Sequence, residues 1–388
     1  MSREALHIYL ITLGFFILTW AIVPIIPRYV MCLGGDPSTI GLVMSAAPTA
    51  TAATRVVFSI VSDLRSRVFM MRFGMLLLGI SYLLLYISTD LYGVILGRVL
   101  QGFSLASFIP PSIAYVVDIA RRGVIGRALG TRALMVSIGY TLGPFLGGLI
   151  SELLGYKALF IIASASAFAI IPAIRFDDHG RNVYTASLLF REMVRVVMRK
   201  DFILLFTSTA FQTIILASVI PFLSSYLKLI GYSDYEAGVI SSAYGLAGLF
   251  SRLLMSFFTD KAVMKLAVLG LCVDSVGIVL LSYYPTPPSV FLPVLLIGFG
   301  DGLFVPCIQA LVFINSKTEL RSMLSGIYAT SWDVGMLVGP LITGYLITVT
   351  SDYLLTFRYL LIFTTISAVI LIYEKLGVRV RASQLSPP

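Results

Sequence analysis

The chain has 388 residues, of which 58% are hydrophobic and 12% are charged. With a mean hydropathy of +0.95, the chain has too few polar groups to cover itself in water, which excludes a soluble globular protein and indicates a lipid environment. The formal net charge of +9 does not indicate a nucleic-acid partner, because most Lys and Arg residues lie on one side of the predicted membrane topology.

Long apolar runs predict helices that cross the membrane, since about 20 residues at 1.5 Å each span its hydrocarbon core. The first run lacks a small-residue cleavage site, so we expect a retained helix rather than a signal peptide. No alternation of polarity at strand spacing is present, which excludes a β-barrel. The predicted fold is therefore all-α and polytopic, with 12 transmembrane helices at 5–30, 38–61, 70–88, 91–116, 127–150, 157–175, 203–227, 235–258, 264–284, 289–314, 322–349 and 353–373.

The predicted helices form two sets of six, separated by the longest polar segment. We expect an N-terminal bundle at 1–175, a cytoplasmic linker with a short amphipathic helix at 176–201, a C-terminal bundle at 202–374 and a cytoplasmic tail at 375–388. The excess of Lys and Arg, with Arg132 among them, falls on the side of both termini, so the positive-inside rule places the N- and C-termini in the cytoplasm. The segments expected outside carry Arg28, Lys157, Lys228 and Arg358.

The cysteine and histidine residues do not indicate a cofactor. Cys32, Cys272 and Cys307 are scattered among apolar residues, and His7 and His179 lack partner spacing. This pattern suggests neither a disulfide framework nor a metal site. We therefore expect no metal and no cofactor.

The two halves of the chain are related by internal duplication. Segment 54–63 matches segment 251–260 at an offset of 197, each with an Arg eight residues before an Asp. Segment 102–110 matches 298–306, and Gly143-Pro144 matches Gly339-Pro340, both at an offset of 196. Two similar six-helix bundles are the architecture that alternating access requires, because one bundle can rock against the other around a site at mid-membrane. The pattern indicates a secondary transporter.

Signature segments make the chain resemble the major facilitator superfamily over essentially its whole length. Segment 59–67 resembles the family's first signature, with Ser in place of both glycines but with Asp63 and Arg67 retained. The resemblance implies that Asp63 meets the N-terminus of helix 322–349 and that Arg67 pairs with Asp118. Arg98-Val-Leu-Gln101-Gly102 resembles the Arg-x-x-Gln-Gly signature that implies proton coupling.

Helix 127–150 carries the most specific signature. Gly139, Gly143, Pro144, Gly147 and Gly148 fit the G-x-x-x-G-P-x-x-G-G pattern typical of the family's drug and proton antiporters. Glycines at this spacing clear one helix face, so that another helix can approach closely, and Pro144 permits a bend. Static packing glycines are the alternative. Helix 322–349 repeats the pattern weakly with Gly335, Gly339, Pro340, Thr343 and Gly344.

Ionisable residues inside membrane helices cost several kcal/mol unless partnered, so each needs a reason. Residues present in both halves are assigned to gating; with the resemblance signature, the gating candidates are Arg55, Asp63, Arg67, Asp118, Arg252 and Asp260. Residues without a counterpart are better candidates for substrate or ion binding, with Asp301 and Asp333 ahead of Asp274, whose predicted helix lies on the outside of the family fold. Together with neutral side chains, the candidates for proton coupling or substrate binding are Trp20, Arg98, Gln101, Gln212, Asp301 and Asp333.

These features predict a monomeric secondary transporter in the plasma membrane of a prokaryote. The expected function is proton-coupled export of small organic molecules, hydrophobic or cationic, by alternating access. An uptake symporter or a facilitator on the same fold is the alternative, because a fold alone does not fix direction. An intramembrane enzyme is the more remote alternative, because no zinc-protease motif, nucleophile elbow or phosphate-binding loop is present.

Overall fold

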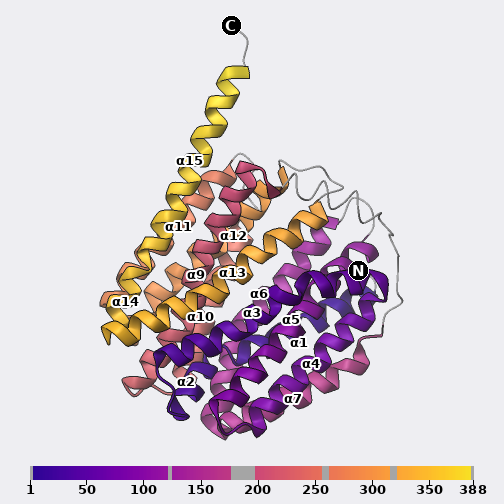
Figure 1. Ribbon diagram of the computed structural model, residues 1–388, viewed down its shortest axis with the longest axis vertical. Helices are drawn as coiled ribbons and strands as arrows, with labels where there is room; N and C mark the ends of the chain where they lie inside the picture. Colours follow the sequence, from indigo (N-terminus) through magenta and orange to yellow (C-terminus); the bar gives the residue numbers. More distant parts are fainter. Residues whose placement is uncertain (1–2, 121–124, 176–196, 256–261, 315–320, 386–388) are drawn as a thin grey trace. The chain divides into compact units, whose positions relative to one another are not determined.

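The computed structural model describes residues 3–120, 125–175, 197–255, 262–314 and 321–385, and all regular elements in these ranges are helices (Figure 1). Twelve helical segments among these residues are long and apolar enough to cross a membrane, which confirms the all-α polytopic prediction. The elements are α1 (Arg3–Ala21), α2 (Ile25–Cys32), α3 (Pro37–Leu64), α4 (Arg67–Ile87), α5 (Leu91–Ile119), α6 (Ile125–Leu154), α7 (Tyr156–Ile170), η1 (Ile171–Ala173), α9 (Lys200–Leu229), α10 (Asp234–Met255), α11 (Val263–Tyr283), α12 (Phe291–Ile314), α13 (Arg321–Thr350), α14 (Tyr353–Tyr359) and α15 (Leu361–Leu385).

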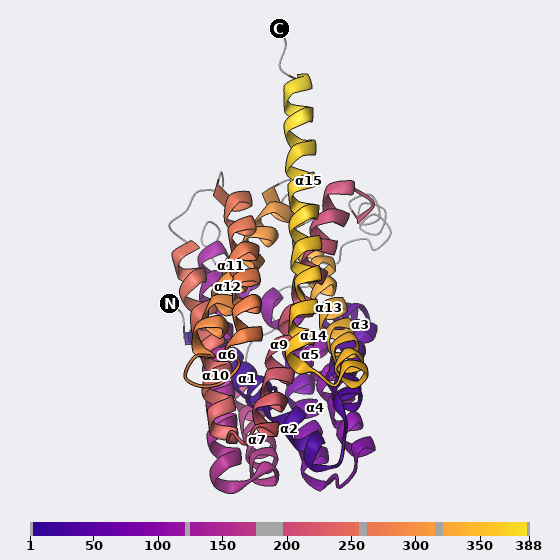
Figure 2. The same ribbon diagram turned by 90° about the vertical axis from the view of Figure 1, so that its left-hand side faces the viewer.

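Two features of the helices differ from the prediction, and a third predicted feature lies outside the described residues. The first span is broken between α1 and α2 at residues 22–24, where Pro24 has no backbone N–H to donate. The last span is broken at Leu360, and α15 then continues to Leu385, beyond the predicted end at 373 (Figure 2). The amphipathic helix expected in the linker falls on residues 176–196, which lie outside the described residues.

The chain forms two compact units that do not follow the predicted bundle boundaries. Unit 1 comprises residues 1–183, 218–246 and 337–353, and unit 2 comprises residues 184–217, 247–336 and 354–388. Helices α9, α10 and α13 therefore each contribute one end to unit 1 and the other end to unit 2. The division into bundles 1–175 and 202–374 follows the sequence duplication and stays a prediction.

Unit 1 is built on packing of α3 and α4 against α5, of α1 against α6, and of α4 against α7. In its core the rings of Phe15 and Phe108 stack with centroids 3.9 Å apart, and Tyr82 donates a hydrogen bond to the carbonyl of Leu18 (2.7 Å). At the start of α3, Asp36 accepts a hydrogen bond from Thr39 N (2.8 Å), and hydrogen bonds from Thr39 lower the pKa of this carboxyl.

Unit 2 is built on packing of α11 against α12 and α15. Its core contains Leu271, Phe304, Cys307, Tyr328 and Leu371 at an exposure of 3% or less. Tyr328 on α13 and Thr209 on α9 share a hydrogen bond of 2.9 Å. Helices α9, α11, α12, α13 and α15 therefore share one core.

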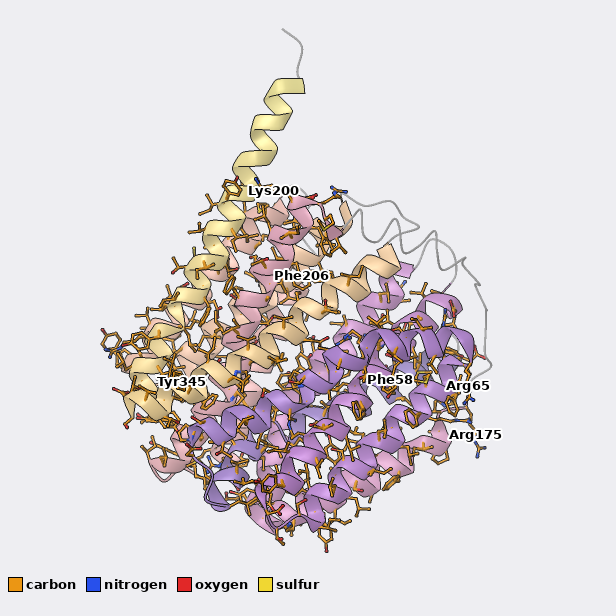
Figure 3. All side chains as sticks on the ribbon, in the orientation of Figure 1. Phe58, Arg65, Arg175, Lys200, Phe206 and Tyr345 are labelled. Atoms are coloured by element: carbon orange, nitrogen blue, oxygen red, sulfur yellow. The ribbon has the colours of Figure 1, made fainter. Side chains whose placement is uncertain are left out.

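The outer surfaces of the helices match a lipid environment. Large apolar side chains such as Tyr345 (64% exposed), Val56 and Leu153 lie on helix exteriors (Figure 3). Such exposure is costly in water and favourable in hydrocarbon. At one end of unit 1, Arg72 Nε donates to Ile174 O (2.8 Å), and Arg65, which precedes α4, lies near Arg175, which follows η1 (Figure 3).

Candidate functional site

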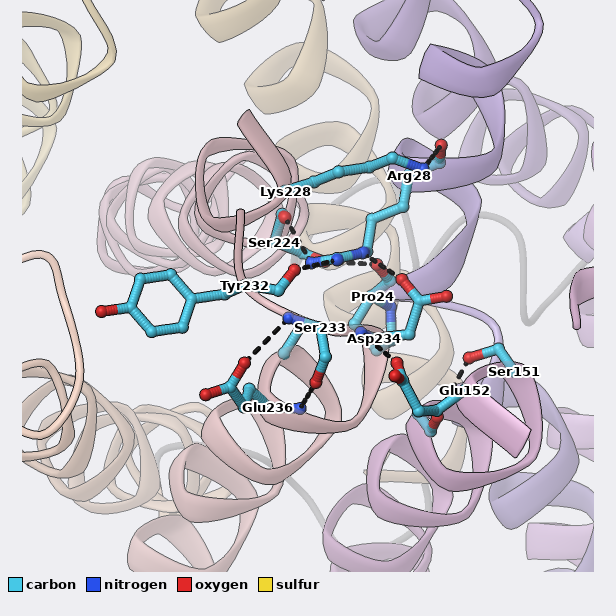
Figure 4. A network of polar contacts seen from close by, with 12 residues as sticks. Pro24, Arg28, Ser151, Glu152, Ser224, Lys228, Tyr232, Ser233, Asp234 and Glu236 are labelled. Carbon is cyan, nitrogen blue, oxygen red and sulfur yellow. Dashed lines mark hydrogen bonds and ion pairs between the residues drawn. The ribbon is translucent and has the colours of Figure 1, made fainter. Parts of the chain in front are cut away.

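Arg28, in the second segment of the first span, is buried and forms the centre of a polar network in unit 1 (Figure 4). Its Nε donates to Asp234 on α10, and the two side chains form an ion pair with 3% and 11% of their surfaces exposed. Its Nη1 and Nη2 donate to the backbone carbonyls of Ser224 (3.2 Å) and Tyr232 (2.5 Å). One guanidinium thus ties α2 to the end of α9 and to the start of α10.

Three more side chains complete this network. Lys228 Nζ donates to Arg28 O (3.0 Å) and to Tyr156 Oη (2.9 Å). Tyr156 in turn donates to Asp234 Oδ1 (3.2 Å), and Asp234 N donates to Glu152 Oε2 (2.9 Å). We call these five residues the Arg28 cluster. Because both ion-pair partners are buried, loss of one charge would cost about 3–5 kcal/mol.

Helix α6 packs against α1 along a face of glycines. A Cβ on Gly147 would lie 1.8 Å from Ala21 O, and one on Gly139 or Gly143 would lie 2.6 Å or 2.8 Å from the nearest atom of α1. These distances are shorter than any real Cβ contact, so the backbones meet only because the side chains are absent. The close helix approach expected at these glycines is confirmed, and α1 is the partner.

The same motif also contacts α10, through its other face. A Cβ on Gly148 would lie 2.9 Å from Gly238 Cα, and a Cβ on Gly238 would lie 2.5 Å from Pro144 O. This contact is adjacent to Asp234, so the glycine motif and the Arg28 cluster close the same seam between α6 and α10 in unit 1.

Helix α13 makes the equivalent contacts with α3 and α9. In unit 1 a Cβ on Gly344 would lie 2.4 Å from Pro37 O, and one on Gly41 would lie 2.4 Å from Pro340 O. In unit 2 a Cβ on Gly335 would lie 2.5 Å from a carbonyl of α9. Thus α6 packs on α1 and α10, and α13 packs on α9 and α3, as expected for a duplicated chain.

The seam between α6 and α1 gives a sharp test of packing. We expect Gly147→Ala to destabilise the protein by about 1–3 kcal/mol, because the added methyl overlaps Ala21 O. Gly130→Ala on the same helix is the matched control, since nothing lies within 4 Å of its Cβ, and we expect a change within about 0.5 kcal/mol. Thermal unfolding of the two variants in detergent measures the difference; equal stability would contradict the tight seam.

A group of polar residues lies inside unit 2, and we call Gln212, Arg252, Asp274 and Asp301 the acid cluster. Asp274 on α11 is fully buried, and its Oδ2 accepts a hydrogen bond from Gln212 Nε2 on α9. Its Oδ1 has no hydrogen-bond partner among the described residues, and neither does Gln212 Oε1. A buried, charged carboxylate with an oxygen that accepts no hydrogen bond is costly in a membrane protein. Protonation of Asp274 would remove this cost, because a protonated carboxyl is neutral.

Asp301 belongs to the same cluster, because α11 and α12 meet at the glycines beside the two acids. A Cβ on Gly300 would lie 2.9 Å from Asp274 N, and one on Gly270 would lie 2.7 Å from Gly300 O. Asp301 is 3% exposed, and its Oδ2 lies 4.0 Å from Arg252 Nη2 on α10. The positive charge of Arg252 balances the charge of one of the two carboxylates. A proton on the other carboxylate would make the net charge of Arg252, Asp274 and Asp301 zero.

The predicted coupling residue Arg98 is buried in unit 1, but its partners are not carboxylates. Its Nη1 donates to Gln101, its Nε to Val43 O (3.3 Å) and its Nη2 to Met44 O (3.2 Å). Among the described residues, the amide of Gln101 and two backbone carbonyls of α3 accept the hydrogen bonds of Arg98. Arg98 and Gln101 contact each other, and their role in coupling stays a prediction.

Two other predicted residues are buried in different environments. The ring of Trp20 lies 4.2 Å from the ring of Tyr140, centroid to centroid, and Trp20 is 8% exposed. Asp333 on α13 is 7% exposed and lies two residues before Gly335, where α13 meets α9. The structure therefore brings Gln212 and Asp301 into one unit with Asp274, whereas Trp20, Arg98 and Gln101 lie in the other.

Comparison with known proteins identifies the family. The family model described as the Major Facilitator Superfamily matches residues 8–340. The chain belongs to the major facilitator superfamily. Multidrug resistance protein MdtG of Salmonella paratyphi A is 27% identical over 335 residues (82% of each chain), and a multi-drug resistance efflux pump PmrA homolog of Lactococcus lactis is 26% identical over 337 residues (83% of this chain, 82% of the relative). The solved structure of a bacterial homolog of the human lysosomal transporter Spinster shares the fold, with a TM-score of 0.80 at 15% identity over 96% of each chain.

The superfamily signature between α3 and α4 is present in part among the described side chains. Arg67 forms an ion pair with Asp118 at the end of α5, as the resemblance implies. Arg55 on α3 is 9% exposed, and Arg252, its counterpart in the duplication, belongs to the acid cluster. The side chain of Asp63 and all of Asp260 lie outside the described residues. The gating roles of these residues stay predictions.

Sequence reasoning did not predict that three charged residues are buried. Arg28 was assigned only to an outer segment, Asp234 was not singled out, and Arg132 was counted with the cytoplasmic cations, although it is 8% exposed on α6. Asp274 was ranked below Asp301 because its helix was expected to lie outside. The sequence signal that could have identified such residues is a charged side chain inside an apolar segment. A charge at the centre of a span needs a partner, whichever position that span has in the fold.

Proposed function

We propose that this member of the superfamily is a proton-coupled antiporter that exports small organic molecules by alternating access. The acid cluster carries the proposal, because Asp274 is fully buried and keeps one oxygen without a hydrogen-bond partner among the described residues. A proton on this oxygen would remove the cost of burying a charge, and its release would restore the anion. Such a group can carry one proton per transport cycle.

The hydrogen bond between Gln212 and Asp274 can couple substrate binding to proton release. Gln212 donates to Asp274 from α9, the seventh span, and in the superfamily fold this span lines the central cavity. A substrate that binds to Gln212 would compete for this hydrogen bond and so favour release of the proton. Asp301 lies in the same cluster, with its Oδ2 4.0 Å from Arg252 Nη2, and we assign it as the second carboxyl to which a proton could pass.

We assign to the Arg28 cluster the role of closing one side of the transporter. The contacts of α6 with α10 and of α13 with α3 form part of the same closed seam. The buried ion pair of Arg28 and Asp234 and the backbone contact at Gly148 hold these helices together in unit 1. The positive-inside rule places both termini in the cytoplasm, so this seam is on the external side of a prokaryotic plasma membrane. Alternating access requires that it part once per cycle.

The relatives support export rather than uptake. Both are named for multidrug resistance, and one is named an efflux pump. The glycine motif of α6, which is typical of the antiporter branch, packs here as a continuous seam. A single chain contains both homologous halves, which is consistent with a functional monomer.

Dye retention in a bacterium lacking its own efflux pumps tests this function. We expect cells that express the chain to retain less of at least one of three dyes of different charge, fluorescein, ethidium and Hoechst 33342, and a protonophore to abolish the difference. Export that persists after the proton gradient is collapsed would contradict proton coupling. Greater retention than in control cells would instead indicate an uptake symporter.

A further inference from the structure

Arg132 on α6 is a buried cation. It is 8% exposed, and its Nη2 donates to Ser112 Oγ on α5 (2.7 Å). Among the described residues, its buried Nε has no hydrogen-bond partner and no ion pair includes Arg132. An arginine stays charged, so its burial must be compensated by an anion or by several acceptors.

Arg98, which is also buried in unit 1, differs from Arg132 because all three of its guanidinium nitrogens donate hydrogen bonds. Arg98 donates from all three nitrogens, to Gln101 and to two carbonyls of α3. Arg132 has one hydroxyl as its partner, and Ser112 is itself a donor to Ile109 O (2.7 Å). Ser112 therefore orients the guanidinium without neutralising it. Arg132 keeps donors for a further, negatively charged group.

Aromatic side chains accompany this cation in unit 1. Tyr140 lies two turns further along α6, about 12 Å at 1.5 Å per residue, and it is within electrostatic reach of Arg132. The ring of Tyr140 lies 4.2 Å from that of Trp20, centroid to centroid. A guanidinium with two aromatic rings further along the same helix suits a ligand with an apolar aromatic body and an anionic group.

We propose that Arg132 binds the anionic group of the transported substrate, such as a carboxylate or sulfonate, while Trp20 and Tyr140 contact its aromatic body. This inference rests on the proposed transport function and narrows its substrate class. It differs from the sequence-based expectation of hydrophobic or cationic substrates. A planar guanidinium binds a carboxylate with two parallel hydrogen bonds, which a lysine does not reproduce.

Fluorescence anisotropy on the purified, full-length protein in detergent tests this site. The probes are fluorescein and its methyl ester, which share one ring system and differ by one carboxylate. We expect wild type to bind fluorescein more tightly, and Arg132→Gln to weaken fluorescein binding about 10- to 100-fold, as expected for loss of a charge-assisted hydrogen bond. The affinity for the ester should change less than about twofold, which also shows that the variant is folded.

Two further variants make the assignment specific. Arg127→Gln removes a cation from an exposed position on the same helix, so fluorescein binding should stay at the wild-type level. Arg132→Lys keeps the charge but not the paired geometry and should give an intermediate affinity. Equal binding of both dyes by wild type, absence of fluorescein binding, or an equal loss in Arg127→Gln would overturn the proposal. Binding in detergent needs no proton gradient, so these outcomes are independent of whether transport is proton-coupled.

Discussion

Proteoliposomes that contain Asp274→Asn are expected to lose substrate accumulation driven by a proton gradient, down to the level of protein-free vesicles. Asparagine has the size of aspartate and can still accept a hydrogen bond from Gln212, but it neither binds nor releases a proton. Exchange of labelled for unlabelled substrate does not require net proton movement, so it should continue. The two assays together separate loss of coupling from loss of binding.

Asp90→Asn is the matched control for this variant. Asp90 caps α5 by accepting a hydrogen bond from Gly93 N (2.8 Å), and asparagine caps a helix as well as aspartate does. This substitution removes one carboxylate at an exposed position and should leave both accumulation and exchange at wild-type levels. If Asp274→Asn accumulates substrate as wild type does, the coupling carboxyl is not Asp274.

A disulfide between Ser38→Cys and Thr348→Cys is expected to stop transport reversibly. The two hydroxyl oxygens are 2.8 Å apart across the seam of α3 and α13, so sulfur atoms in their place lie close enough to bond after a small adjustment. If this seam parts in every cycle, a covalent link across it blocks the cycle. Oxidation should reduce transport at least tenfold, about 1.4 kcal/mol or more in barrier, and reduction should restore it.

The cross-linking experiment requires a background without Cys32 and Cys272. The thiol of Cys32 is exposed and lies 2.7 Å from Lys228 Nζ of the Arg28 cluster. Cys272 is exposed as well, so Cys32→Ser and Cys272→Ser together prevent unwanted disulfides. Each single cysteine variant, treated with the same oxidant, controls for damage by oxidation. Full transport by fully cross-linked protein would show that the seam between α3 and α13 stays closed during transport.

Much of the fold could be predicted because hydrophobic length is a strong signal in a membrane protein. Twelve spans were expected, and the part of the chain that the structure describes contains twelve, since a bilayer fixes how long each apolar helix must be. The break at residues 22–24 and the extension of α15 were missed, because helix ends depend on local packing. The glycine face of α6 was predictable in type, whereas its partners α1 and α10 follow only from the tertiary structure.

The candidate site was predictable only in part. The sequence duplication singled out Asp301, and Gln212 was a candidate as a neutral polar side chain; the structure places both with Asp274 in one cluster. The sequence did not show that Asp274 is fully buried, because burial and hydrogen-bond partners depend on helix rotation, which a continuous apolar run does not reveal. Likewise, Arg28 and Asp234 are 206 positions apart, and their spacing carries no signal of an ion pair.

Proton movement driven by a substrate gradient alone tests proton-coupled antiport most directly. Proteoliposomes with a pH-sensitive dye inside, at equal pH on both sides, are given a gradient of a substrate identified by dye retention. We expect proton flow opposite to the substrate in wild type and none in Asp274→Asn. Equilibration of substrate across the wild-type membrane without any change in internal pH would contradict proton-coupled antiport.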